Sequence, residues 1–109
     1  MIFPVRHKQH RPGEMNKTEL AYSQRLQALK YAGEILDFKF ECLKLKLAVK
    51  TFYTPDFLVI YPGHIEIHEV KGWWEEDARV KIKVAAEMFP WFQFRGVKLI
   101  RREWVYGDF

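Results

Sequence analysis

Two runs of alternating residues around a Pro-Gly turn constrain this fold most strongly. The stretch TPDFLVIYPGHIEIHEVKG occupies residues 54–72. Apolar residues recur there at every second position, which is typical of β-strands. Pro62 and Gly63 suit a tight connection, because proline fixes φ and glycine adopts conformations that other residues avoid. The sequence therefore predicts a β-hairpin.

Three polar residues fall on the core-facing side of this hairpin. Glu69 and Lys71 share a side with the isoleucines that precede them, because residues two apart in a strand point the same way. Asp56 shares a side with the apolar residues at every second position after it. Buried charges need compensation. Either Lys71 pairs with Asp56 or Glu69 at the rim of the sheet, or a divalent cation binds the two carboxylates.

The residues before the hairpin predict a helix and then strands. Leucine and alanine recur at helical spacing from Asn16 to Gly33, and Asn16 with Glu19 has the pattern of a capping box. Residues 36–47 alternate as strands do, with a change of parity after Cys42 that indicates a bulge or bend. We expect Cys42 itself to pack in an apolar environment.

The residues after the hairpin predict one more helix and one more strand. We expect the helix over residues 75–88, ending before Pro90, then a strand over residues 92–100 and an irregular tail. A chain of 109 residues supports a single core. The prediction is one domain of the α/β (α+β) class over residues 16–109. It has an α-β-β-β-α-β order and a mixed central sheet flanked by helices, and it follows a basic arm over residues 1–15.

Basic residues and the N-terminal sequence bear on partners and location. The formal net charge of +4 permits a polyanionic partner without requiring one. Phosphate contacts or ordinary solvation explain the basic residues equally well, and Trp73 suits base stacking or packing. The chain has no apolar run of membrane-spanning length and no signal-peptide pattern, so we expect a cytoplasmic protein without a membrane partner. The candidate nucleic-acid-binding residues are Arg6, Lys8 and Arg11 of the arm, Arg79, Lys81 and Lys83 of the second helix, and Trp73.

Pro55 and Asp56, followed by Glu69, Val70 and Lys71 on the next strand, resemble the signature of the PD-(D/E)XK nuclease superfamily. The expected order of elements over residues 16–100 is similar to the restriction-endonuclease-like core of that superfamily. The pattern most resembles small phage-encoded members and Holliday-junction resolvase-like endonucleases. These also place a glutamate on the first helix, where this chain has Glu19.

The resemblance implies a metal-dependent DNA endonuclease. Asp56 and Glu69 would bind Mg²⁺ or Mn²⁺ together with the backbone carbonyl of Val70, and Lys71 would orient or help to activate the attacking water. Glu19 would support the metal from the first helix, unless it is only a helix cap. The resemblance and the small size of the chain favour branched DNA such as a four-way junction as the substrate. If the substrate has two equivalent strands, we expect a homodimer, because a twofold-symmetric pair of sites matches a symmetric junction. For a phage-encoded member, the compartment would be the cytoplasm of the bacterial host.

Two other functions are compatible with the sequence. A nuclease-like fold that binds nucleic acid without cutting it would keep the basic surfaces but would not depend on Asp56 or Lys71. A protein-interaction module would use its tryptophans to bind a protein partner, and its binding to DNA at physiological salt would be weak.

Overall fold

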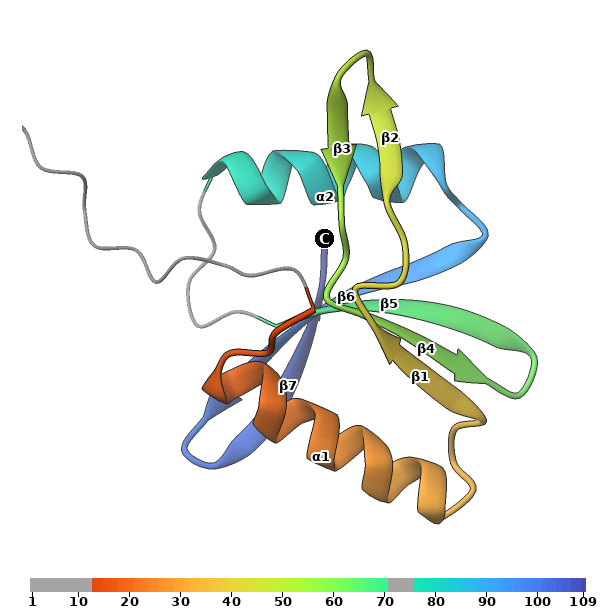
Figure 1. The fold of residues 1–109 in the computed structure, drawn as a ribbon, viewed down its shortest axis with the longest axis vertical. Helices are drawn as coiled ribbons and strands as arrows, with labels where there is room; N and C mark the ends of the chain where they lie inside the picture. Colours follow the sequence, from red (N-terminus) through yellow and green to blue (C-terminus); the bar gives the residue numbers. More distant parts are fainter. Residues whose placement is uncertain (1–12, 71–75) are drawn as a thin grey trace, which may run out of the picture.

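The structure, a computed structural model, describes residues 13–70 and 76–109 (Figure 1). Within these residues the chain forms two helices and seven strands. In chain order they are α1 (Lys17–Tyr31), β1 (Asp37–Phe40), β2 (Leu45–Ala48), β3 (Thr51–Tyr53), β4 (Phe57–Tyr61), β5 (His64–Val70), α2 (Glu76–Met88), β6 (Phe92–Ile100) and β7 (Glu103–Asp108).

Five strands form the central sheet, in the order β1-β4-β5-β6-β7. Neighbouring strands are antiparallel except β5 and β6, which are parallel and are linked along the chain by α2. The strands β2 and β3 form a separate hairpin, which extends away from the sheet and crosses α2 in the view of Figure 1. The predicted α/β class, with a mixed sheet flanked by helices, is confirmed.

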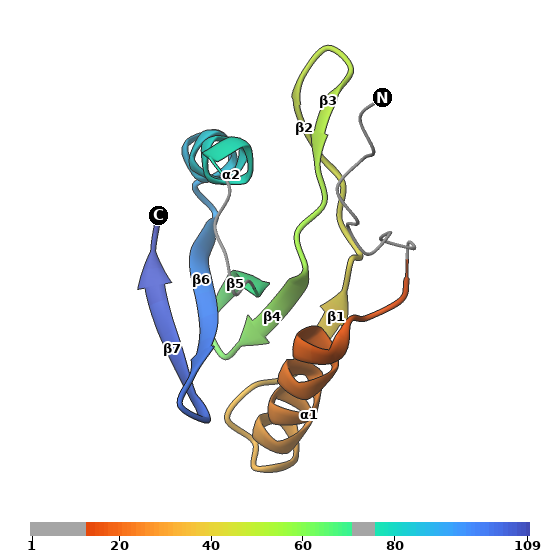
Figure 2. The same ribbon diagram turned by 90° about the vertical axis from the view of Figure 1, so that its left-hand side faces the viewer.

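The two helices cover opposite faces of the central sheet (Figure 2). Val70 packs in one buried cluster with Tyr22 and Leu26 of α1, whereas Ile67 packs in another with Ile82 of α2. These two faces are called the α1 face and the α2 face below. Both faces of β5 are therefore buried. Within the described residues, no helix combines the length and apolar character that a bilayer crossing requires.

The helix α1 begins with the predicted capping box. The Glu19 N–H donates to Asn16 Oδ1 at 2.8 Å, and the Asn16 N–H donates to Glu19 Oε1 at 2.9 Å. Both bonds satisfy N–H groups that have no partner inside the helix. Tyr22 and Leu26, one turn apart, point into the core and are fully buried. The chain leaves the helix through Gly33, whose φ of 81° favours glycine.

The predicted hairpin is confirmed as β4 and β5. Gly63 has a φ of 92° in the turn, and Ile60 pairs with Ile65 beside it. Leu58 then pairs with Ile67, which places Leu58 and Ile60 on the same side as Ile65 and Ile67, as their spacing predicts. Phe57 and Val59 lie on the other side and are fully buried there. This register fixes which residues face each other at the far end of the hairpin.

The strand run before the hairpin is divided between two sheets. β1 ends at Phe40, Glu41 takes a φ of 48°, and the chain then turns toward β2. The parity change after Cys42 thus marks a departure from the sheet. The prediction that Cys42 packs is wrong, because the residue lies in this connection and is exposed.

The prediction of an irregular tail is also wrong. β7 pairs antiparallel with β6, and Ile100 lies opposite Glu103 across a two-residue turn. Arg101 and Arg102 form the turn with φ values of 51° and 68°. Such turns normally carry asparagine or glycine, so two arginines gave no turn signal in the sequence.

Candidate functional site

Asp56 and Glu69 lie side by side at one end of the β4–β5 hairpin. Phe57 pairs with His68, so Asp56 and Glu69 occupy the next opposed positions on the two strands. The Asp56 backbone N–H donates to Glu69 Oε1 at 3.3 Å. The structure thus brings together the two carboxylates that the sequence pattern places on one side of the hairpin.

Neighbouring donors orient both carboxylates. The Val70 N–H donates to Asp56 Oδ2 at 2.8 Å, and the Tyr53 hydroxyl donates to Glu69 Oε1 at 2.5 Å. Burial and the negative charge of Glu69 raise the pKa of Tyr53 well above its usual value of 10.0. The hydroxyl therefore stays protonated and is the donor of this hydrogen bond. The sequence analysis missed Tyr53, since a tyrosine in a strand is ordinarily a packing residue.

Both carboxylates are withdrawn from water, with Asp56 only 6% and Glu69 only 5% exposed. Two adjacent negative charges in such surroundings repel each other and lose hydration, so their ionised forms need hydrogen bonds or a cation. The two side chains offer carboxylate oxygens, and oxygen is the ligand that Mg²⁺ and Mn²⁺ prefer.

The described residues supply two carboxylates toward a divalent cation of this hard type. In the part of the chain that the structure describes, no group of three or more His, Cys, Asp or Glu side chains converges on one point. Among the described residues, backbone oxygen, together with water, could complete the coordination of an ion held by Asp56 and Glu69.

Glu19, the third predicted carboxylate, serves as the helix cap described above. It is 4% exposed, and within the described residues its side chain hydrogen-bonds only to Asn16. The two roles that the sequence allows for Glu19 therefore have different outcomes. The capping box is present, and the support of a metal by Glu19 remains a prediction.

Several predicted residues lie outside the described part of the chain. They are Arg6, Lys8 and Arg11 of the arm, and Lys71 and Trp73 after β5. The three basic residues of the second helix are described, and Arg79, Lys81 and Lys83 are all exposed on α2.

The β2–β3 hairpin adds basic residues to this region. Lys81 Nζ donates to the Phe52 backbone oxygen at 3.4 Å, which connects α2 to β3. Lys44 Nζ lies 4.6 Å from the centre of the Phe52 ring, a cation–π contact. Lys44 and Lys46 are exposed on the side of the hairpin opposite buried Leu45. The same hairpin ends at Tyr53, which pairs with Leu45, so Tyr53 lies on the opposite side of the hairpin from Lys44 and Lys46.

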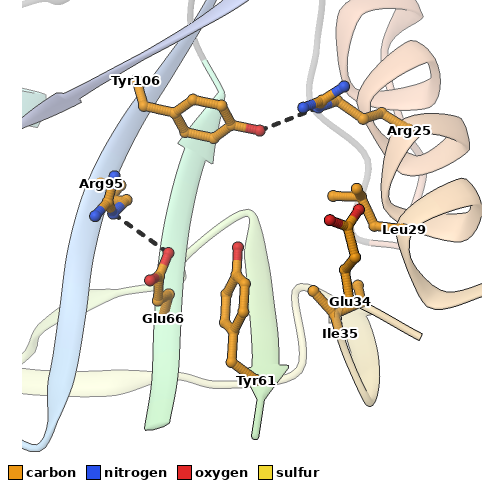
Figure 3. Close-up of a pocket in the computed structure, with 8 residues that line it drawn as sticks. All are labelled: Arg25, Leu29, Glu34, Ile35, Tyr61, Glu66, Arg95 and Tyr106. Carbon is orange, nitrogen blue, oxygen red and sulfur yellow. Dashed lines mark hydrogen bonds and ion pairs between the residues drawn. The ribbon is translucent and has the colours of Figure 1, made fainter. Parts of the chain in front are cut away.

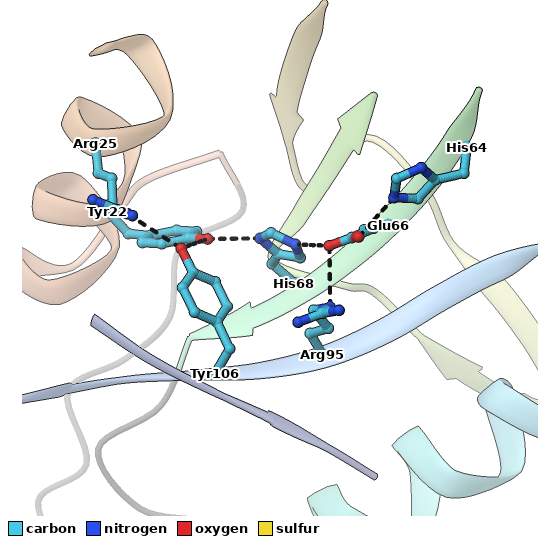
Figure 4. Close-up of polar contacts among 7 residues, drawn as sticks. All are labelled: Tyr22, Arg25, His64, Glu66, His68, Arg95 and Tyr106. Carbon is cyan, nitrogen blue, oxygen red and sulfur yellow. Dashed lines mark hydrogen bonds and ion pairs between the residues drawn. The ribbon is translucent and has the colours of Figure 1, made fainter. Parts of the chain in front are cut away.

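A second polar group occupies the α1 face of the sheet (Figure 4). His68 is fully buried, and Glu66 is 5% exposed. His68 Nε2 lies 2.8 Å from Glu66 Oε1, and His64 Nε2 lies 2.7 Å from Glu66 Oε2. On the other side of His68, Nδ1 lies 2.6 Å from the hydroxyl oxygen of Tyr22. A buried network of this size specifies a unique arrangement when every member has a partner.

The hydrogen-bond directions in this network follow from the charge of Glu66. Burial raises the pKa of Glu66, but hydrogen bonds from His68 and His64 outweigh it, so the pKa lies below its usual value of 4.5. The carboxylate accepts, so His68 donates through Nε2. In a neutral imidazole, Nδ1 then accepts from the Tyr22 hydroxyl. Tyr106 donates in turn to Tyr22 at 3.0 Å.

The sequence carried a signal for this network that went unused. His64, Glu66 and His68 alternate with Ile65 and Ile67 along β5. Polar residues at every second position ordinarily indicate a solvated face. Here α1 covers that face, and the partner residues Tyr22 and Tyr106 come from segments distant in sequence.

Comparisons with protein-family models, curated proteins and solved structures found no significant match to this chain.

Proposed function

We propose that this protein is a metal-dependent DNA endonuclease whose reaction centre contains Asp56 and Glu69. The proposal rests on the juxtaposition of these two buried acidic residues, in which the backbone N–H of Asp56 donates to Glu69 Oε1 at 3.3 Å. A small core rarely holds two adjacent carboxylates, because their burial is costly unless a cation or several donors compensate for it. The PD-(D/E)XK signature suggests which reaction such a pair would perform, namely phosphodiester hydrolysis. This chain resembles the signature at Pro55 and Asp56 and at Glu69, Val70 and Lys71.

Each residue has a defined task in this proposal. Asp56 and Glu69, with the Val70 carbonyl, would hold a Mg²⁺ or Mn²⁺ ion, which when bound supplies Lewis acidity toward a phosphodiester. The Val70 N–H and the Tyr53 hydroxyl keep the two carboxylates in fixed orientations. Lys71 follows Val70 in the chain and would stabilise the charge that develops on the phosphoryl oxygens.

The distribution of charge supports nucleic acid as the partner. No acidic residue occurs between Glu41 and Asp56, whereas Lys44, Lys46 and Lys50 fall in that interval. These lysines belong to the β2–β3 hairpin and its turn, which lead directly to Asp56. Lysines along such an arm would contact phosphates without reading sequence. A branched DNA substrate and a homodimer remain part of the proposal.

Cleavage assays distinguish this function from a non-catalytic binder. The purified protein is incubated with linear, nicked, flapped and four-way-junction DNA in Mg²⁺, and in parallel with a chelator. We expect Mg²⁺-dependent cleavage, strongest on one of the branched substrates, and its loss in Lys71→Ala with DNA binding retained. Binding of DNA without cleavage in any metal would favour the non-catalytic alternative.

A further inference from the structure

A pocket of about 340 Å³ lies on the α1 face of the sheet, away from the Asp56 and Glu69 pair (Figure 3). Residue alternation separates the two sites, because Glu66 and His68 point to the α1 face and Glu69 points to the α2 face. The volume is within the range of pockets that bind small molecules. The lining residues are Arg25 and Leu29 of α1, Glu34 and Ile35 after it, Tyr61 of β4, Glu66 of β5, Arg95 of β6 and Tyr106 of β7.

Most of the polar groups that remain available in this pocket are donors. Within the described residues, Arg25 hydrogen-bonds only through Nε, to the Tyr106 hydroxyl at 3.2 Å. Arg95 Nε lies 3.3 Å from Glu66 Oε1 in an ion pair, but it makes no hydrogen bond to any described residue. The Nη groups of both arginines make no hydrogen bond to a described residue, and each presents donors in a planar fork.

Tyr61 adds a third donor. Its hydroxyl makes no hydrogen bond to a described residue, and its ring stacks on His64 with centroids 4.7 Å apart and an interplanar angle of 7°. Burial and the nearby charge of Glu66 raise the pKa of Tyr61 to about 12, so the hydroxyl is protonated at neutral pH. The stacking holds the ring in place while the hydroxyl points into the pocket (Figure 3).

The two acidic residues of the pocket differ in how accessible they are. Both oxygens of Glu66 accept from histidines, and Arg95 balances its charge. Glu34 is exposed, and its charge acts on Arg25. Glu34 is therefore the one carboxylate of the pocket lining that would compete with an incoming anion for Arg25.

We propose that this pocket binds the oxyanion of a small organic phosphate or carboxylate through Arg25, Arg95 and the Tyr61 hydroxyl. Arginine forks match the paired oxygens of both groups. The pocket is larger than a bare phosphate ion, and Leu29 and Ile35 offer an apolar wall to the organic part of the ligand. The buried network of Glu66, His68 and Tyr22 fixes the strands that carry these groups before a ligand arrives.

Calorimetric titration with phenyl phosphate, phenylacetate and inorganic phosphate tests the proposal. We expect saturable binding of phenyl phosphate or phenylacetate with a Kd below about 1 mM, tighter than that of inorganic phosphate. Arg25→Gln, an exposed change, should weaken it about tenfold or more, and Tyr61→Phe should weaken it severalfold. Glu34→Gln should strengthen it, because the competing carboxylate is removed.

The control variant is Asp56→Asn, which changes the other face of the sheet and should leave this binding unchanged. Circular dichroism and thermal melts verify that each variant is folded. The proposal is wrong if neither organic anion binds below about 10 mM. It is equally wrong if Arg25→Gln and Tyr61→Phe both bind as tightly as the wild type. Competition by a short single-stranded DNA against phenyl phosphate would assign the oxyanion to a nucleic-acid phosphate, and failure to compete would assign it to a free small molecule.

Discussion

The Tyr53 hydroxyl donates a 2.5 Å hydrogen bond to Glu69 Oε1, and this bond joins the β2–β3 hairpin to the end of β5. Tyr53 is buried among the residues beneath α2. The hydrogen bond therefore couples the position of a basic hairpin to the orientation of a carboxylate in the proposed reaction centre.

Removal of this hydroxyl should destabilise the protein. Tyr53→Phe keeps the ring but leaves the buried Glu69 carboxylate with one donor fewer, which typically costs about 1–3 kcal/mol. The free energy of unfolding from urea titration measures the effect. Tyr31→Phe is the matched control, because Tyr31 is 90% exposed and its change should be neutral. Equal stabilities for the two variants would contradict the structural role of the bond.

Glu19→Gln separates the two roles of Glu19. Glutamine also suits a capping box, so the melting temperature should stay close to that of the wild type. If the carboxylate also supports the metal, single-turnover cleavage should fall by about 10- to 100-fold, as is usual when residues around a metal are lost. We expect the loss of activity.

The control for Glu19→Gln is Asn16→Ala, which removes the cap from the other side. It should lower stability by about 1 kcal/mol while cleavage per folded molecule is retained. If Glu19→Gln cleaves DNA as fast as the wild type, Glu19 acts only in the helix cap.

Protein stability should depend on pH through Glu66. Its pKa is lower in the folded protein than its usual 4.5, so the folded state favours the ionised form. The resulting stabilisation is present above pH 4.5 and is lost as the pH falls through the folded pKa. Between about pH 5 and 3, the unfolding free energy should therefore fall more steeply in the wild type than in Glu66→Gln. Parallel slopes in denaturant titrations would contradict this role of Glu66.

Substitution of the hairpin lysines should weaken DNA binding without affecting specificity. Lys44→Gln combined with Lys46→Gln removes two charges, so the slope of log K against log salt should become about 1.8 less steep if both contact phosphates of duplex DNA. Binding is measured in the presence of a chelator to prevent cleavage. Lys17→Gln, an exposed change on α1, is the control and should lower the slope less. An unchanged slope in the double variant would mean that these two lysines of the hairpin do not contact DNA phosphates.

The hairpin, both helices and β6 could be predicted from sequence, because each depends on local periodicity and on capping or turn residues. Three features could not. β7 follows a turn made by Arg101 and Arg102, which rarely adopt positive φ. The division of residues 36–47 between two sheets depends on the packing of the β2–β3 hairpin beneath α2.

The third feature is the network around His68, which requires partners from α1 and β7 that no local pattern reveals. For the carboxylate pair the opposite holds, because strand register alone places Asp56 opposite Glu69. The carboxylate pair can therefore be predicted from the local sequence pattern. The contact of Tyr53 with Glu69 and the pocket on the α1 face become apparent only in the tertiary structure.

Paired measurement of Mn²⁺ affinity and DNA cleavage in Asp56→Asn tests the central claim most directly. The variant removes one anionic oxygen ligand from the proposed metal site but keeps the size of the side chain. Asp108→Asn, an exposed change on β7, is the control. We predict that Asp56→Asn loses Mn²⁺ binding by calorimetry and Mg²⁺-dependent cleavage together, while Asp108→Asn retains both. Unchanged Mn²⁺ affinity and unchanged cleavage in a folded Asp56→Asn protein would contradict the claim.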